Sequence, residues 1–374
     1  MEKRPIISLS IALGIATTTV AIIFIARGYV VNLSQKKIEK TGMILAQSTP
    51  KGAKIYLDGK LVETTDTVLS SLPPKTYRVK IEKEGFSPWE KDIPVLEELI
   101  TEIDALLLPT SPHLTPLTNS GISLLAPSPQ KDQIAYTTRN GKTPGLWVLD
   151  LTHPTVLNLI QENPRLIAGD TKKHTFSLAE KVVWSPKEDT LLITLNPRGH
   201  VFLNIHDNLP KETTSSAQPT LSLWEKTTQT QKTKWAAKLE IPEELSEIAT
   251  APTTQWSPNK ERFLFTRTRD GYKEWHVFNG EKPLGVGKQR EYISLKFKKD
   301  SPVHVSWHRT NNHLIVENGG VISIVEIDGS NSTEVYSGNL ADPHVLPTPD
   351  GSNLIILTSF KQNGDPNLYA IGLR

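Results

Sequence analysis

The stretch VVWSPKEDTLLITL, Val182–Leu195, decides the fold of this protein. It contains an apolar run that ends at Trp184, a Ser-Pro step followed by charged residues, and a second apolar run. Runs of β-branched and aliphatic residues separated by turn-forming residues are typical of two strands joined in a hairpin. One hairpin cannot bury its own apolar face, so the fold depends on whether the hairpin recurs and at what spacing.

The hairpin recurs four times. The other copies are LLAPSPQKDQIAYTT from Leu124, TTQWSPNKERFLFTRTRDGYKEWHVFNG from Thr253, VSWHRTNNHLIVENGGVISIVEIDG from Val305 and HVLPTPDGSNLIILTS from His344. The turns begin at residues 128, 185, 257, 307 and 348. The shorter intervals match the roughly 40–50 residues of a four-stranded propeller blade, and a ring of blades buries every apolar face. The sequence therefore predicts an all-β protein in which residues 119–374 form a β-propeller of five or six blades.

Several segments have expected places in this ring. LSLWEK, 221–226, is interpreted as a strand, and the polar stretches 208–220 and 227–234 as surface insertions. Residues 293–297 would belong to a sixth blade if one exists. The last strand, 367–374, is expected to pair with a strand near 122–126, or one just before it, and so to close the ring.

The repeats resemble the WSPDG-type units of TolB-like and WD-repeat-like propellers. In such units the tryptophan packs between blades and the Ser-Pro step makes the turn. Trp184, Trp256 and Trp307 share one repeat position, and Trp147, Trp224 and Trp275 recur on a later strand. We expect core packing for all six.

Residues 46–108 form a separate small β domain. Ala53, Ile55 and Leu57 alternate with polar residues, Asp58-Gly59 favours a tight hairpin, and a further strand is expected near Thr101–Leu108. This stretch resembles the PEGA domain, a module of cell-surface proteins. The resemblance rests on Ser48, Pro50, Gly52-Ala53, Tyr56-Leu57-Asp58-Gly59-Lys60, Tyr77, Val79, Gly85-Phe86 and Trp89, with departures at Lys51, Thr65-Asp66 and Lys75. It implies a small antiparallel β-sandwich.

The first 32 residues are expected to be a membrane anchor. Ile6–Ala26 carries no charged side chain, and 21 helical residues at about 1.5 Å each span roughly 30 Å, the thickness of a bilayer core. A cleaved signal peptide is the alternative, but its apolar region is usually shorter. Residues 33–45 are interpreted as a polar stalk compatible with a helix, and residues 109–118 as a proline-rich linker.

Two arguments about membrane orientation conflict. Lys3 and Arg4 precede the apolar run, whereas Arg27 and three lysines follow it, so the positive-inside rule favours a cytoplasmic C-terminus. The surface-type β module and the propeller favour an extracytoplasmic one. We expect the domains after the anchor to lie outside the cytoplasmic membrane, in a single-pass protein.

Composition and motifs point away from several kinds of chemistry. A net charge of +2 gives no basic face for nucleic acid, and the absence of cysteine removes disulfides and thiolate sites. His304, His308 and His313 invite a metal interpretation, but residues four apart on a strand are about 13 Å apart. Neither a Gly-x-Ser-x-Gly elbow nor a phosphate-binding glycine loop is present. We predict no catalytic residues, no metal and no cofactor.

The remaining hypothesis is a binding or scaffold protein of the cell envelope, with a protein or cell-wall glycan as partner. A propeller enzyme, either a glycan lyase or a hydrolase, is the alternative. Binding chemistry should lie on loops, because strands are occupied by packing. The candidate residues are Arg139, Arg198, Arg267, Arg269 and Tyr272. The four arginines follow the second strand of their repeats, and Tyr272 lies in the same loop as Arg267 and Arg269. Arginines gathered at one end of the ring would favour an anionic partner.

Overall fold

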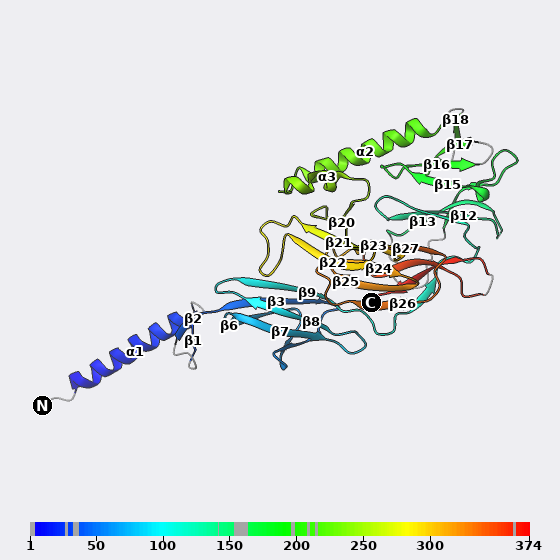
Figure 1. Ribbon diagram of the computed structural model, residues 1–374. Helices are drawn as coiled ribbons and strands as arrows, with labels where there is room; N and C mark the ends of the chain where they lie inside the picture. The colour runs from blue at the N-terminus through cyan, green and yellow to red at the C-terminus, as the bar shows by residue number, and fades with distance from the viewer. Residues whose placement is uncertain are drawn as a thin grey trace. The chain divides into compact units, whose positions relative to one another are not determined.

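The computed structural model describes residues 4–26, 29–32, 37–140, 142–152, 164–195, 199–207, 210–213, 216–361 and 364–374 (Figure 1). The chain divides into two compact units. The first comprises residues 1–108 with 282–289, and the second comprises residues 109–281 with 290–374.

The first unit begins with helix α1 (Arg4–Ala26) and the hairpin of β1 (Tyr29–Asn32) and β2 (Lys37–Lys40). Within the part of the chain that the structure describes, no helix combines the length and apolarity needed to cross a membrane. The span expected over residues 6–26 is therefore not confirmed. The helix-compatible stalk is also not what is observed, because β2 and the start of β3 (Gly42–Thr49) occupy much of 33–45. Ile44 and Ala46 alternate inward on β3, which makes that segment a core strand.

The rest of the first unit is a two-sheet β-sandwich. One sheet has the order β6-β3-β9 and the other has the order β5-β4-β7-β8. The strands are β4 (Lys54–Leu57), β5 (Lys60–Thr64), β6 (Thr67–Leu72), β7 (Lys75–Glu82), β8 (Trp89–Val95) and β9 (Ile100–Leu106). The predicted hairpin at Asp58-Gly59 is confirmed, with φ of 50° and 82°. The sandwich is not wholly antiparallel, because β3 and β9 pair in parallel.

The second unit contains five four-stranded antiparallel sheets in its described residues, here called blades 1 to 5. Blade 1 has β11 (Leu124–Pro127), β12 (Gln133–Thr138), β13 (Gly145–Asp150) and β14 (Arg165–Gly169). Blade 2 has β15 (Lys181–Trp184), β16 (Thr190–Leu195), β17 (Gly199–Asn204) and β18 (Pro210–Thr213). Blade 3 has β19 (Gln255–Trp256), β20 (Arg262–Arg269), β21 (Tyr272–Asn279) and β22 (Glu291–Lys298).

Blade 4 has β23 (Val303–Trp307), β24 (His313–Asn318), β25 (Val321–Glu326) and β26 (Thr333–Ser337). Blade 5 combines β27 (Asp342–Pro347), β28 (Asn353–Thr358) and β29 (Asn367–Gly372) with β10 (Leu114–Pro116) from the start of the unit. The expected pairing of the last blade with a strand just before 122–126 is confirmed, since β10 pairs with β29. The stretch 109–118 is therefore not only a linker, and the propeller begins before residue 119, because Leu114–Pro116 supply the outer strand of blade 5. Residues 293–297 belong to β22, the fourth strand of blade 3, and not to a sixth blade.

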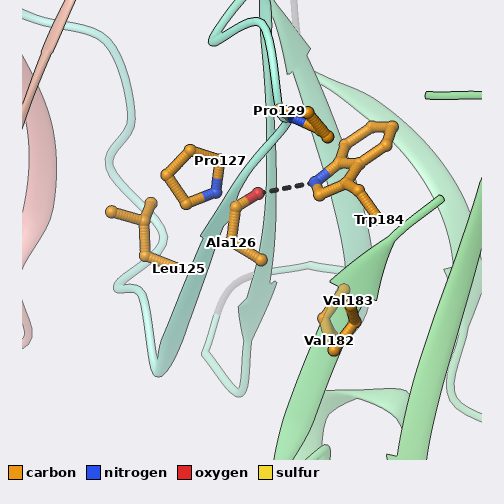
Figure 2. A pocket seen from close by; sticks show the side chains of 7 residues that line it. All are labelled: Leu125, Ala126, Pro127, Pro129, Val182, Val183 and Trp184. Carbon is orange, nitrogen blue, oxygen red and sulfur yellow. Dashed lines mark hydrogen bonds between the residues drawn. The ribbon is translucent and has the colours of Figure 1, made fainter. Parts of the chain in front are cut away.

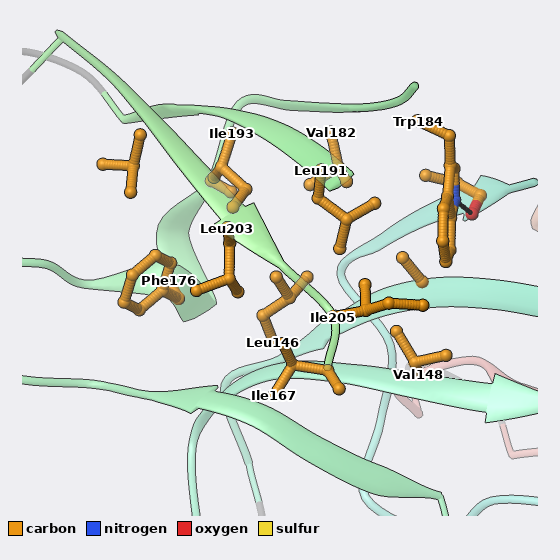
Figure 3. Packing of buried hydrophobic residues seen from close by; sticks show 14 of the residues in the cluster. Leu146, Val148, Ile167, Phe176, Val182, Trp184, Leu191, Ile193, Leu203 and Ile205 are labelled. Carbon is orange, nitrogen blue, oxygen red and sulfur yellow. Dashed lines mark hydrogen bonds between the residues drawn. The ribbon is translucent and has the colours of Figure 1, made fainter. Parts of the chain in front are cut away.

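Apolar clusters join successive blades. Blades 1 and 2 share the largest cluster, in which Leu146 and Val148 meet Leu191 and Leu203 (Figure 3). Blades 5 and 1 share a cluster that includes Ile134, Leu149, Ile355 and Leu357, and blades 3 and 4 share one that includes Trp275, Val277, Trp307 and Leu314. On blades 4 and 5, the rings of His304 and His344 lie 5.6 Å apart.

Two helices stand between blades 2 and 3. The segment expected as a strand and a polar loop is α2 (Gln218–Ala236), followed by α3 (Glu243–Thr250) (Figure 1). Trp224 of α2 contacts Phe202 of blade 2, and Trp235 contacts Trp256 of blade 3. The five β-sheet blades therefore follow one another in a propeller-like arrangement, with the two helices inserted between blades 2 and 3.

Candidate functional site

The Ser-Pro turns form one end of the ring and are tied to one another. The fourth residue of each turn has a left-handed backbone, with φ of 62° at Lys131, 63° at Glu188, 62° at Lys260, 62° at Asn311 and 68° at Gly351. Hydrogen bonds then connect turns of different blades. The Gln130 amide donates to Glu188, the Asn259 amide to Asn311 Oδ1 at 2.9 Å, and Arg309 to the Gln130 carbonyl at 2.8 Å. Hydrogen bonds between turns therefore hold this end together.

A shallow apolar groove lies between β11 and β15 near this end (Figure 2). Its volume is about 360 Å³, and Leu125, Pro127 and Val183 are among the residues that line it. Trp184 donates its indole N–H to the Ala126 carbonyl at 2.8 Å, so the tryptophan bridges the two blades. The groove offers little hydrogen-bonding chemistry and is a poor site for a polar partner.

The three histidines that suggested a metal lie apart. His308 and His313 sit on either side of one turn, with ring centroids 6.3 Å apart, and the Thr310 hydroxyl contacts the Nδ1 atoms of both. His304 instead faces His344 of blade 5. The two turn histidines therefore support the turn of blade 4.

Three of the predicted arginines, Arg139, Arg267 and Arg269, belong to the opposite end of the ring, where the second and third strands of a blade connect. Arg139 is exposed directly after β12, and Arg198 lies outside the described residues. Arg267 and Arg269 were expected in a loop but belong to β20, and Tyr272 begins β21. Asp270 and Gly271, with φ of 51° and 78°, complete a two-residue turn, so both strands extend further than expected.

Arg267 and Arg269 line an open hollow on blade 3, here called the blade 3 hollow. Its volume is about 680 Å³, and its other lining residues are Thr268, Glu274, His276, Glu291 and Ile293. These residues come from three adjacent strands. Arg267 stands opposite Glu274, and Ile293 stands opposite His276. The hollow is thus built on the sheet itself, which fixes the spacing of its side chains.

A continuous charged network crosses this hollow. Arg267 Nη1 lies 2.5 Å from Glu291 Oε1, and His276 Nδ1 lies 2.8 Å from the same oxygen. His276 Nε2 lies 3.5 Å from Glu274 Oε2, and Lys296 Nζ lies 2.8 Å from Glu274 Oε1. The hydrogen bond from Lys296 lowers the pKa of Glu274, and the same bond raises the pKa of Lys296.

The network changes the interpretation of the arginines. Arg267 is paired with Glu291, and Arg269 lies 3.5 Å from Asp270, so neither guanidinium stands without a nearby carboxylate. The hollow therefore presents arginine donors whose charge is largely balanced, with Tyr272, 39% exposed, opposite Arg269 at the end of the hairpin. Such a surface suits hydrogen bonding to a polar partner at least as well as attraction of an anion.

Sequence reasoning missed Glu274, His276 and Glu291. The available signal was the alternation in YKEWHVFN, where a glutamate and a histidine share one face of a strand with Phe278. His276 is only 3% exposed and stacks on Phe265. Its Nε2 atom lies 3.5 Å from Glu274 Oε2 and makes no shorter hydrogen bond among the described residues.

A second hollow, here called the blade 1 hollow, lies between the start of the unit and blade 1. Its volume is about 740 Å³. Trp147 and Tyr136, which stand opposite each other on β13 and β12, both line it. The remaining lining residues are Pro116, Leu117, Thr118, Asn119, Ser120, Thr138, Asn140, Lys142, Thr143 and Pro164.

The six tryptophans do not all behave as expected. Trp184, Trp256, Trp275 and Trp307 are buried, as predicted. Trp147 and Trp224 are only partly buried. Trp224 packs from a helix against Phe202, and Trp147 lines the blade 1 hollow.

Comparison with known proteins identifies the small β domain. Residues 41–111 match the PEGA domain family, so the expected resemblance is confirmed with nearly the expected bounds. No curated protein sequence matches the chain.

Three solved structures are similar to this chain at low sequence identity. TolB from Acinetobacter baumannii is 13% identical with a TM-score of 0.26, and the match covers 88% of this chain but only 64% of TolB. Oligogalacturonate lyase from Vibrio parahaemolyticus is 9% identical with a TM-score of 0.31, and the match covers 80% of this chain and 86% of the lyase. The Cps50 (Swd1) β-propeller domain from Myceliophteria thermophila is 9% identical with a TM-score of 0.20, and the match covers 69% of this chain and 73% of that domain.

These similarities are too distant to carry function. The chain spans 64% of the TolB structure, and all three identities are 13% or lower. The propeller-like architecture rests on the chain's own sheet order and on the pairing of β10 with β29.

Proposed function

We propose that this protein is a binding or scaffold protein of the cell envelope, whose propeller recognises a protein or cell-wall glycan through the end of the ring that carries the blade 3 hollow. The PEGA domain supports the location, since the module resembles those of surface proteins. The observation that carries the proposal is the blade 3 hollow itself, in which Arg267, Glu291, His276 and Glu274 are held on three paired strands.

The geometry supports recognition better than catalysis. A glycan-cleaving acid needs a carboxyl group whose pKa is raised, so that it holds a proton at working pH. Glu274 has the opposite environment, because Lys296 lowers its pKa. Glu291 is engaged by both Arg267 and His276. Both carboxylates are therefore placed as fixed acceptors that orient the arginine and histidine donors.

The hollow is also rigid enough for selective binding. Arg267 lies over the Phe265 ring, with its Cζ atom 5.0 Å from the ring centroid, and Phe265 in turn stacks on His276. Side chains that are already ordered lose little entropy when a partner binds. Arg269 and Tyr272 at the rim are exposed and supply the first contacts.

The proposal is tested with the full chain and its Arg267→Ser/Arg269→Ser variant. In producing cells the full chain should fractionate with the envelope. Purified wild type should be retained on isolated cell-wall material, and the double variant should be retained several-fold less at low salt. Raising the salt concentration should reduce the difference in retention between wild type and the double variant, because exposed charges are screened over about 10 Å at 0.1 M.

An Arg165→Ser/Lys187→Ser variant is the matched control. It removes the same charge from exposed positions near the Ser-Pro turns, away from the hollow. Equal retention of wild type and the hollow variant at low salt, or an equal loss in the control, would contradict the proposed surface.

A further inference from the structure

We propose that the Ser-Pro turns form a binding site for a phosphate group at the centre of their end of the ring, with Lys131 of blade 1 and Lys260 of blade 3 as its cations. The site is separate from the blade 3 hollow, and the inference does not rest on the proposed function. It starts from the fourth residue of each turn, which contacts a neighbouring blade in some turns and is a lysine in two others.

Blades 2 and 4 show how the fourth turn residue joins one blade to the next. The Gln130 amide of blade 1 donates to the Glu188 carboxylate of blade 2, and the Asn259 amide of blade 3 donates to Asn311 Oδ1 of blade 4. In both pairs the fourth residue accepts a hydrogen bond from the third residue of the preceding turn. A lysine ammonium has only donors and cannot take this role. The two lysines therefore place a cation where other blades place an acceptor.

Both lysines also have an unfavourable backbone conformation. Their φ angles are 62°, in the left-handed region that favours glycine, asparagine and aspartate. Blades 4 and 5 carry Asn311 and Gly351 at the same position, which suit this backbone better. Residues that persist in a strained backbone often mark binding sites. The turn geometry therefore gives no reason for the lysines, whereas binding of an anion does.

Contacts between the turns bring the cations together near the centre of the ring. The first strands of neighbouring blades contact each other, as β11 and β15 do, and each turn directly follows a first strand. Arg309 of blade 4 donates to the Gln130 carbonyl of blade 1 at 2.8 Å and lies 2.5 Å from Asp132 of the same blade. A third cation therefore lies beside the turn that carries Lys131.

The cations repel one another. Burial, and then the charges of Arg309 and Lys260, lower the pKa of Lys131 to about 8, so its ammonium is still mostly protonated at pH 7. Burial and Arg309 also lower the pKa of Lys260, although Asp132 and Glu188 act in the opposite direction. Both carboxylates are already engaged, Asp132 by Arg309 and Glu188 by a turn amide.

The two ammonium groups lack a counter-ion but remain accessible. Across the described part of the chain, neither lysine has an ion pair or a hydrogen bond, and Lys260 Nζ lies 4.8 Å from the centre of the Trp235 ring. Both side chains are partly buried, yet neither Nζ atom is sealed from solvent. Partly buried cations without a counter-ion are unfavourable, and a bound anion would relieve that cost.

The chemistry of the cluster selects a phosphate group. Two ammonium groups from different blades can each bond a different oxygen of one phosphate, and lysine binds phosphate as a point charge. The two positive charges match the dianion of a phosphate or phosphomonoester. A carboxylate brings one charge and two oxygens on a single edge, and a neutral ligand would leave the cations uncompensated.

The test is calorimetric titration of the full chain at pH 7 with inorganic phosphate, at an ionic strength held constant with chloride. Lys131→Asn and Lys260→Asn should each weaken phosphate binding about ten-fold, the value of one charge-assisted hydrogen bond. Neither substitution should lower the melting temperature, because asparagine suits the left-handed backbone and the repulsion is reduced. A parallel titration with glycerol 3-phosphate tells a phosphomonoester from the free ion, since the natural form should bind more tightly.

Lys187→Asn is the matched control, because Lys187 is an exposed third residue of the blade 2 turn. It should bind phosphate like wild type, and so should Arg267→Ser/Arg269→Ser. The inference is overturned by an absence of saturable phosphate binding, by acetate that binds as tightly, or by wild-type affinity in both lysine variants. An equal loss in Lys187→Asn also overturns it, as does a loss confined to the arginine variant, which would assign the anion to the blade 3 hollow.

Discussion

One repeat position shows how a hydroxyl side chain supports four of the five turns. Ser128, Ser185, Ser257 and Thr348 each place a hydroxyl within 3.2 Å of the backbone amide five residues later, which donates to it. The hydroxyl thereby satisfies an amide that the tight turn would leave without a partner. In blade 4 the same position is His308, fully buried and supported by the Thr310 hydroxyl.

His308 should make the protein sensitive to acid. Burial, with a contribution from His313, lowers its pKa from 6.5 to about 3. Between those values the unfolded chain binds a proton that the folded chain excludes, so this contribution to stability is complete above pH 6.5 and is lost as the pH falls toward 3. The free energy of unfolding should fall by up to about 1.4 kcal/mol per pH unit from this residue.

The measurement is urea unfolding of wild type and His308→Ser between pH 7 and pH 4. The variant introduces the serine that three other blades carry, and its stability should decline less steeply with acid. His206→Ser, at an exposed position, should follow the wild-type slope. Parallel slopes for wild type and His308→Ser would show that the buried imidazole titrates normally.

Among the elements, α2 is the one that sequence reasoning placed in the wrong class. LSLW was interpreted as a strand because a short apolar run fits both strand and helix. The partly buried positions Leu221, Trp224, Thr227, Gln231 and Trp235 instead recur at three or four residues. That is the period of a helix with one face on a neighbour. This helical face is recognised only from its contacts with blades 2 and 3, where Trp224 packs on Phe202 and Trp235 on Trp256.

The buried side chain of Lys232 connects α2 to the segment after α3 through hydrogen bonds. Lys232 Nζ donates to the carbonyls of Ala251 at 2.6 Å, Pro252 at 3.2 Å and Thr254 at 2.9 Å. Replacing it by methionine keeps most of the side chain but leaves these carbonyls without their donor. We expect Lys232→Met to lower the free energy of unfolding by about 1–3 kcal/mol in urea denaturation.

Lys234→Met is the control for this prediction. Lys234 lies on the same helix but is exposed, so its replacement should change stability by less than about 0.5 kcal/mol. Equal effects of the two substitutions would mean that the carbonyl contacts of Lys232 contribute nothing measurable.

For the whole molecule, closure by β10 decides whether the ring is stable alone. Leu114–Pro116 form the outer strand of blade 5, and the Leu117 amide continues the pairing by donating to the Leu368 carbonyl at 2.8 Å. Blade 5 therefore draws strands from both ends of the unit. Such pairing makes the unfolding of any blade depend on the others.

Two truncations test this dependence. A fragment of residues 110–374 should fold as a monomer, because it keeps β10 and every blade. A fragment of residues 119–374 exposes the edge of β29 and should melt several degrees lower by calorimetry. Identical melting temperatures would show that β10 is not part of the stable ring.

The sequence by itself determined the repeat and the small β domain. Each depends on local information: alternation along strands, turn residues such as Ser-Pro and Asp58-Gly59, and spacing between copies. These patterns are set by backbone and side-chain geometry within a few residues, which is why they can be read from one chain.

Only the tertiary structure decided how the site is built, that the insert is helical, and that Leu114–Pro116 close the ring. Arg267 and Arg269 were predicted for binding from their repeat position, but Glu291 and Glu274 reach them from strands whose register no local pattern reports. The contrast between Trp147, open to a hollow, and Trp275, 4% exposed, likewise depends on which segment covers each ring. Charge balance, burial and access are properties of contacts between distant residues, and those contacts exist only once the blades have assembled.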